Sequence, residues 1–158
     1  MTISTLTRPL TKLARGLELL RAPFGLATRL YVGWVFLKSG WWKLTNWDQT
    51  VSLFETEYKV PLLSPTLAAI TGTFGELFFP ILLILGLAGR VGALGTFAVN
   101  VMAVVSYYHV LSQEGFEAGL WQHYLWGFML AVLAIYGTGA LSIDRLLAHR
   151  TRAERDWD

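Results

Sequence analysis

Four long apolar blocks constrain the fold of this chain more than any other feature. They cover about 24–44, 64–88, 90–110 and 121–140, and a helix needs roughly 20 residues to cross the hydrocarbon core of a bilayer. A core helix of a soluble protein keeps a polar face, and the stretch "LFFPILLILGLAG" has none. Hydrophobic residues make up 54% of the chain and charged residues only 15%. The sequence therefore predicts a membrane protein and not a soluble helical domain.

The predicted fold class is an all-α membrane protein, an antiparallel four-transmembrane-helix bundle preceded by an N-terminal amphipathic interfacial helix. In the first segment, 1–22, leucines recur at helical spacing opposite Lys and Arg. This pattern is typical of a helix that lies on an anionic membrane surface. We expect 23–144 to form the four-helix transmembrane domain and 145–158 to form a basic cytoplasmic tail.

The distribution of charge predicts the orientation of the spans. Lys and Arg gather at the N-terminus, at Arg90 and in the tail, while the two longer connections are acidic on balance. Since loops rich in Lys and Arg stay in the cytoplasm, we expect both termini there. The expected location is the bacterial inner (plasma) membrane, with the lipid bilayer as the first partner and no nucleic acid as a partner.

The chain contains no cysteine. It therefore cannot bind a Cys-ligated metal or Fe–S cluster or use thiol redox chemistry. Any redox role requires a bound cofactor, a quinone or a partner protein.

Polar residues inside the apolar blocks are the first candidates for function, because an ionisable group in a span costs several kcal/mol unless it is paired. At about 1.5 Å rise per residue, Glu76 and Asn100 come to the same depth, and Arg29 lies deeper but within reach. We expect Arg29 to pair with Glu76 in an interior network with Asn100. The same network could instead serve only to fix the helix register.

Each apolar block also carries a stripe of mainly small residues with a polar group on it, which we expect to face inward. Lys38 lies on the opposite side of the first block, where it either snorkels to the interface or makes a different contact. The four stripes are Arg29, Gly33, Phe36, Gly40 and Lys43; Ala69, Gly72, Glu76, Pro80 and Leu83; Ala93, Thr96, Asn100 and Tyr107; and His123, Gly127, Leu130, Ala134 and Gly137.

A second group of candidates lies where the third block ends and the fourth begins. His109 and His123 stand there with Tyr107 and two glutamates, and His with carboxylates can bind copper, zinc or iron. A separation of fourteen residues is not a local metal motif, so the alternative is that these side chains are headgroup anchors. The same two histidines could instead be ligands of a haem, which is a further alternative.

The stretches "RLYVGWVFLKSGWWKL" and "GTFGELFFPILLILGLAGR" resemble the DoxX family of small four-helix membrane proteins, over about 29–147. The middle of the chain is similar to the branch associated with biosynthesis of small metal-binding peptides, which points to metal homeostasis. The positions that match the family pattern are Arg29, Gly33, Gly40, Lys43, Glu76, Leu77, Gly86 and Arg90.

The resemblance implies membrane redox chemistry near quinone, since related proteins include a subunit of a thiosulfate:quinone oxidoreductase. We expect Glu76 and Arg29 to be catalytic, Glu76 by transferring a proton and Arg29 by stabilising negative charge. The ligand-binding candidates are Asn100, Lys43, Tyr107 and Lys38.

Three functions follow as hypotheses. The first is a subunit of a quinone-linked redox system that works with a partner protein in metal or sulfur chemistry. The second is a non-catalytic scaffold that recruits a partner enzyme or a metal-binding peptide. The third is a small transporter, for which a homo-oligomer would be needed because four spans leave little room for alternating access.

Overall fold

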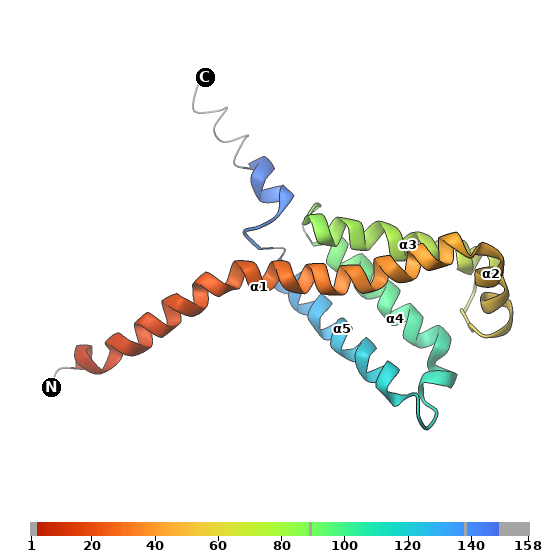
Figure 1. Cartoon of the computed structure of the whole chain (residues 1–158), viewed down its shortest axis with the longest axis horizontal. Coiled ribbons are helices and arrows are strands. Elements are labelled where there is room, and N and C mark those ends of the chain that lie inside the picture. The colour runs from red at the N-terminus through yellow and green to blue at the C-terminus, as the bar shows by residue number, and fades with distance from the viewer. Residues whose placement is uncertain (1–2, 89, 138, 149–158) are drawn as a thin grey trace, which may run out of the picture.

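The computed structural model describes residues 3–88, 90–137 and 139–148, and their side chains from residue 12 onward. All regular structure in this part of the chain is helical, as the sequence predicts, and it contains no strand. Residues 149–158 of the predicted tail lie outside the described residues. Five helices are labelled in Figure 1: α1 (Ile3–Thr45), α2 (Trp47–Thr56), α3 (Pro65–Leu85), α4 (Val91–Leu111) and α5 (Glu117–Tyr136).

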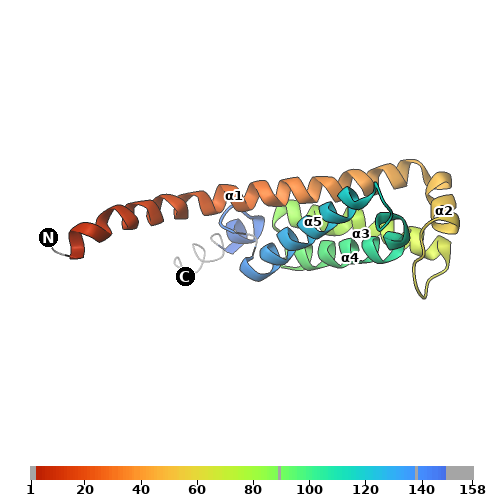
Figure 2. The ribbon, with the colours of Figure 1, turned by 90° about the horizontal axis from the view of Figure 1, so that it is seen from below.

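The first helix is one continuous element of 43 residues. The sequence separates an interfacial segment from the first span near residue 22, but the helix passes through this boundary without a break. Such a helix is roughly 65 Å long, about twice the thickness of a hydrocarbon core. Its N-terminal half extends beyond the other helices (Figures 1 and 2), and its leucines from residue 13 to residue 20 are exposed.

Local sequence explains where α3 begins and ends. The Ser64 hydroxyl accepts a hydrogen bond from the Leu67 N–H at 3.4 Å, and a proline follows at the first helical position, an arrangement typical of helix N-termini. The helix ends at Gly86, whose φ of +63° is left-handed. Glycine adopts this conformation without the steric cost of a Cβ.

The helices pack in a ring. Helix α1 packs on α3, α3 on α4, α4 on α5, and α5 returns to α1 (Figure 2), while α2 packs across one end of α1 and α3. Glycines allow the closest approaches, as expected for membrane helices. A Cβ at Gly33 would lie 3.4 Å from the carbonyl of Pro80, and one at Gly40 would lie 2.9 Å from the Cβ of Glu76. A later residue of α1 therefore contacts an earlier residue of α3, so these two helices run in opposite directions.

Within the described residues, three helices are long and apolar enough to cross a membrane, judged by length and composition. They are α3, α4 and α5, and their bounds agree with the predicted blocks to within a few residues. The predicted span at 24–44 is not among them. Its basic residues Arg29, Lys38 and Lys43 lower the hydropathy of this half of α1.

Candidate functional site

The inward stripe predicted on α1 is confirmed by burial. All five of its residues are buried, and Lys38 on the other side of the helix is exposed. Burial follows the predicted stripes on α3 and α4 as well, with Glu76 at 8% exposure and Asn100 at 3%. Helical periodicity therefore placed Arg29, Glu76 and Asn100 correctly on buried faces.

Glu76 pairs with Lys43. The Lys43 ammonium lies 2.6 Å from each carboxylate oxygen of Glu76 and also donates to the Ser39 hydroxyl at 3.1 Å. The predicted pair of Glu76 with Arg29 is wrong. Gly40 contacts Glu76, and Lys43 lies one turn further along α1, whereas Arg29 is fourteen residues, or roughly 21 Å, away from Lys43 along the helix.

Arg29 lies where α3 ends and is fully buried. Its guanidinium donates to the carbonyl of Leu141, and a Cβ at Gly86 would collide with its Nη1. A cation here interacts favourably with the negative end of the α3 dipole. The Nε and Nη1 atoms have no hydrogen-bond partner among the described residues. In this structure Arg29 therefore holds the segment after α5 against the end of α3.

Asn100 bonds to α5. Its amide nitrogen donates to the carbonyl of His123 at 3.0 Å, and its amide oxygen lies 2.9 Å from Nδ1 of the same histidine. Because an amide oxygen only accepts, Nδ1 carries the proton in this arrangement. Gly127 lets the helices approach here, since a Cβ on it would lie 3.2 Å from the Asn100 amide nitrogen.

The two polar pairs lie at one level of the molecule. Gly75 contacts Val99 between α3 and α4, and these residues precede Glu76 and Asn100 in the sequence. Glu76 and Asn100 therefore lie at about the same level along α3 and α4, which agrees with the depths estimated from the sequence. We name these four side chains the polar layer: Lys43, Glu76, Asn100 and His123.

Two further polar atoms of the interior are without hydrogen bonds in the described part of the chain. They are the Trp126 indole nitrogen and the Thr73 hydroxyl. The Trp126 ring stands edge-on to Phe36 and His123, with centroids 5.8 and 5.0 Å apart. Since a buried donor without a partner is costly, each is available to a polar ligand or to water.

The polar layer is covered at one end by α2 and the segment after it, 47–64, which we name the α2 cap. The Thr50 hydroxyl donates to the carbonyl of Lys43 at 3.0 Å, and Phe54 packs with buried alanines of α3. The Lys59 N–H donates to the carbonyl of Ser106 at 2.8 Å. The α2 cap is thereby tied to α1, α3 and α4.

Tyr58 is the site residue that the sequence does not reveal. Its ring packs against Phe54 and Tyr107, with centroids 4.8 and 5.0 Å apart, and the Tyr107 hydroxyl donates to Glu57 at 3.0 Å. Burial, followed by the charges of Glu76, Tyr107 and Glu57, raises the pKa of Tyr58 to about 12. In the sequence, "ETEYKVP" looks like an ordinary interfacial connection.

The stability of the protein at alkaline pH should reveal this tyrosine. Tyr58 ionises near pH 10.0 when unfolded and near 12 when folded, so its contribution is complete below pH 10 and is lost as the pH rises toward 12. We expect Tyr58→Phe to flatten that decline in denaturant unfolding experiments, and Tyr108→Phe, which changes an exposed ring, to preserve it. Equal slopes in Tyr58→Phe and the parent would contradict the assignment.

The two histidines proposed for a metal make separate contacts. His109 packs edge-on against Tyr107 at 5.8 Å, while His123 bonds to Asn100. Among the residues that the structure describes, no group of three or more His, Cys, Asp or Glu side chains could hold a metal ion. Metal binding by His109 and His123 stays a prediction.

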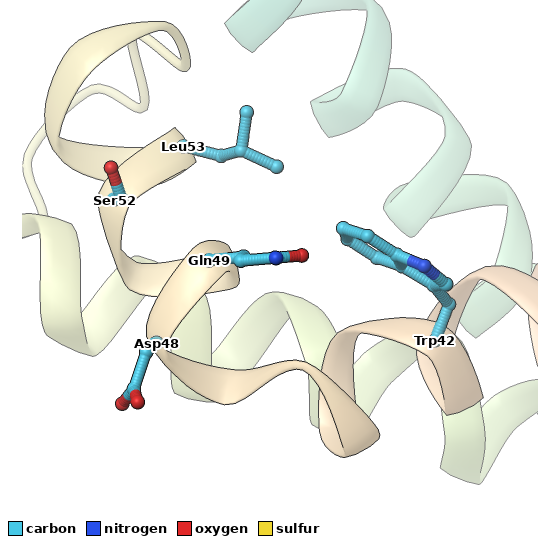
Figure 3. A pocket seen from close by; sticks show the side chains of 5 residues that line it. All are labelled: Trp42, Asp48, Gln49, Ser52 and Leu53. Carbon is cyan, nitrogen blue, oxygen red and sulfur yellow. The ribbon is translucent and has the colours of Figure 1, made fainter.

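An open hollow lies beside the junction of α1 and α2 (Figure 3). The side chains of Trp42, Gln49 and Leu53 point toward its centre, and Asp48 points away from it. Ser52 completes its lining. None of the polar layer lines this hollow, so it is distinct from the buried pairs.

The helices and their apolar surfaces define an all-helical membrane protein. A family model described as DoxX matches residues 24–109, just over half of the chain, and the protein belongs to the DoxX family. The match includes Arg29, Lys43, Glu76 and Asn100, but it ends before α5 and therefore before His123. No curated protein and no solved structure matches the chain in the same comparisons.

Proposed function

We propose that the protein is the membrane subunit of a quinone-linked redox system, with the polar layer as its site. The observation that carries this proposal is the burial of a Lys43–Glu76 pair at the level of a second polar pair, Asn100–His123. Burying charge in this way is costly, and such groups in membrane proteins are functional candidates. The Trp126 N–H, which has no hydrogen-bond partner in the described part of the chain, supplies a further donor.

The chemistry of the site suits a quinone as substrate. Reduction of a quinone to a quinol consumes two electrons and two protons, and the electrons come from a partner protein. Lys43, in the role that the sequence suggested for Arg29, stabilises the negative charge that develops on a carbonyl oxygen. Glu76 transfers a proton to or from that oxygen. The partner's metal or sulfur chemistry would take place at the α2 end, where His109 and His123 occur.

The proposal includes an antiparallel bundle of four spans, with the C-terminal half of α1 as the first. The order of contacts between neighbouring helices supports it. Gly33 and Gly40 of α1 meet α3 in reverse order, and along α3 Gly75 meets Val99 of α4 while the later Leu83 meets the earlier Gly92. The basic N-terminal half of α1 then lies at an anionic cytoplasmic membrane surface. Both termini face the cytoplasm of a bacterial inner membrane in this arrangement.

Quinone binding tests the function. We expect purified protein in native lipids to retain quinone, and Glu76→Gln and Lys43→Met to weaken binding of a quinone analogue by about ten- to a hundredfold. A hydrogen bond to a charged group is worth about 1.5–3 kcal/mol, which corresponds to that range. Binding is measured by titration and by mass spectrometry of extracted lipids. Lys38, which the sequence offers as a ligand-binding candidate, is exposed on the other side of α1 and outside the polar layer, so Lys38→Met is the matched control. Parental affinity in Glu76→Gln would exclude the role of Glu76.

A second function is supported by the tight packing around the same pair. Gly40 lies against Glu76, and Lys43 is bonded to both oxygens of the carboxylate. Such a pair also suits a rigid scaffold that recruits a partner enzyme or a metal-binding peptide. The charge-swap experiment in the Discussion separates this scaffold from the redox subunit.

A further inference from the structure

Asn100 holds His123 at two points. Its amide nitrogen donates to the backbone carbonyl of His123 at 3.0 Å, and its amide oxygen lies 2.9 Å from Nδ1 of the imidazole. Because a carbonyl only accepts, the amide nitrogen must face the carbonyl and the amide oxygen must face the ring. In a neutral imidazole this leaves one arrangement of the proton: Nδ1 carries the hydrogen, and Nε2 carries a lone pair. The absence of a side chain at Gly127 leaves room for this contact between α4 and α5.

The lone pair on Nε2 is an unused acceptor. The two nitrogens of an imidazole point in divergent directions, so Nε2 faces away from Asn100. His123 is half-buried, and its Nε2 makes no hydrogen bond within the described residues. The His123 ring stands edge-on to the ring of Trp126, with centroids 5.0 Å apart, and the buried indole N–H is also without a partner in this part of the chain. An acceptor and a donor therefore belong to two rings in contact.

The carboxylate of Glu76 is a second acceptor in the polar layer. The Lys43 ammonium has three hydrogens and three partners, which are the two oxygens of Glu76 and the Ser39 hydroxyl. Each oxygen of a carboxylate has two lone-pair sites, and the bond to Lys43 uses one of them. A ligand in the polar layer therefore meets two groups that only accept hydrogen bonds, the Glu76 carboxylate and Nε2 of His123.

A quinol and a quinone differ in what they offer to such acceptors. Each oxygen of a quinol carries a hydrogen that it can donate, whereas both oxygens of a quinone only accept. We propose that Asn100 is a positioning residue that fixes Nε2 of His123 as the acceptor for a ligand hydroxyl, so that the polar layer binds a quinol more tightly than the matching quinone. This inference rests on the function proposed above and adds the redox form of the ligand. The Trp126 N–H supplies a donor for the oxygen of the same hydroxyl.

Preferential binding of the quinol changes the redox chemistry of the bound ligand. We expect the quinol to bind about three- to tenfold more tightly than the quinone, the range that one net hydrogen bond provides. Tighter binding of the reduced form raises the reduction potential of the bound couple, by about 30 mV for a tenfold preference in a two-electron reaction. The bound quinone is then a better acceptor for the electrons of the partner protein.

Nitrogen NMR of the imidazole tests the positioning role without a quinone. The chain has three histidines, so protein with isotope-labelled histidine in lipid nanodiscs gives few ring signals, and His123→Phe identifies those of His123 by their loss. At about pH 8, where an ordinary imidazole is neutral, we expect the proton on Nδ1 in the parent. Asn100→Leu should shift it toward Nε2. A proton on Nε2 in the parent, or an unchanged tautomer in Asn100→Leu, overturns the positioning role.

Thr96→Val is the matched control. Thr96 is fully buried one turn before Asn100 on the same helix, and its hydroxyl donates to the carbonyl of Gly92 at 2.8 Å. The substitution removes a buried polar group of α4 without touching the bond between Asn100 and His123. We expect it to preserve the tautomer, and the same shift in Thr96→Val as in Asn100→Leu would contradict the assignment to Asn100.

Binding of the two redox forms tests the preference. A short-chain benzoquinol and the matching benzoquinone are titrated without oxygen onto the parent and the same three variants. We expect the quinol preference in the parent and in Thr96→Val, and a ratio of affinities near one in Asn100→Leu and His123→Phe. A purely structural loss would weaken both forms equally and leave the ratio as it is in the parent.

The outcomes separate this inference from the proposed function. Equal affinities in the parent, or a preference that survives in Asn100→Leu and His123→Phe, overturn the inference while quinone binding itself stands. Absence of binding by both forms contradicts the proposed function and with it the preference. The NMR result on His123 does not depend on either, because it needs no ligand.

Discussion

Replacing Lys43 with methionine should destabilise the protein by about 3–5 kcal/mol, the usual cost of removing one partner from a buried ion pair. Lys43 and Glu76 are each only 10% exposed at their side chains. Without the ammonium, Glu76 must either stay charged in a medium of low polarity or take up a proton. Chemical unfolding in mild detergent measures the loss. Acidification should restore part of it, because protonation removes the uncompensated charge.

Two controls assign this effect to the lost partner. Lys38→Met removes an exposed lysine of the same helix, and we expect it to change the stability by less than about 1 kcal/mol. The double variant Lys43→Met/Glu76→Met should recover most of the loss, since replacing both members of a buried pair with apolar residues is often neutral. Equal stabilities of Lys43→Met and Lys38→Met would contradict the structural importance of the pair.

The charge swap Lys43→Glu/Glu76→Lys distinguishes the two proposed functions. A scaffold needs only the attraction between the two helices, so the swap should restore both folding and recruitment of the partner. A redox site needs the carboxylate and the ammonium in their own positions. In that case the swap restores folding and leaves quinone binding lost.

Helix positions and inward faces could be predicted from the sequence because both depend on local pattern. The apolar blocks predicted α3, α4 and α5 to within a few residues, and the three- and four-residue spacing of small and polar side chains identified the buried stripes. Residues on one helix have a fixed geometry relative to each other. This is why Arg29 and Lys43 were placed on the same face of α1.

The partner of Glu76 depends on the register between helices, which no local pattern fixes. Estimating depth from the ends of a block carries an error of several residues, and one turn already changes which cation meets the carboxylate. One signal was present: Gly40 is the small residue that allows close contact with Glu76, and Lys43 follows it by one turn. Tyr58 could not be predicted because the path of a connection follows from packing.

The close contact of α3 with α4 should be the other sensitive feature of the fold. A Cβ at Gly92 would lie 2.6 Å from the backbone nitrogen of Leu83 and 2.9 Å from the backbone carbon of Leu82. Backbone atoms cannot turn aside as a side chain can, so Gly92→Ala must push the two helices apart. We expect a loss of about 1–3 kcal/mol, the usual cost of overpacking, in the same unfolding measurement.

Gly16→Ala makes the same substitution at an open position, and we expect it to raise the stability where Gly92→Ala lowers it. No atom lies within 4 Å of a Cβ at Gly16, which is also inside a helix, so the only effect is helix propensity, a gain of about 1 kcal/mol or less. Opposite signs for the two variants would show that the contact between α3 and α4, and not helix formation, requires Gly92.

Because Gly92 contacts α3 about two turns from Glu76, a separation of the helices there would also disturb the alignment of Glu76 with Asn100. Gly92→Ala should therefore weaken quinone binding although it removes no polar group, and a variant that is destabilised but binds normally would contradict this coupling.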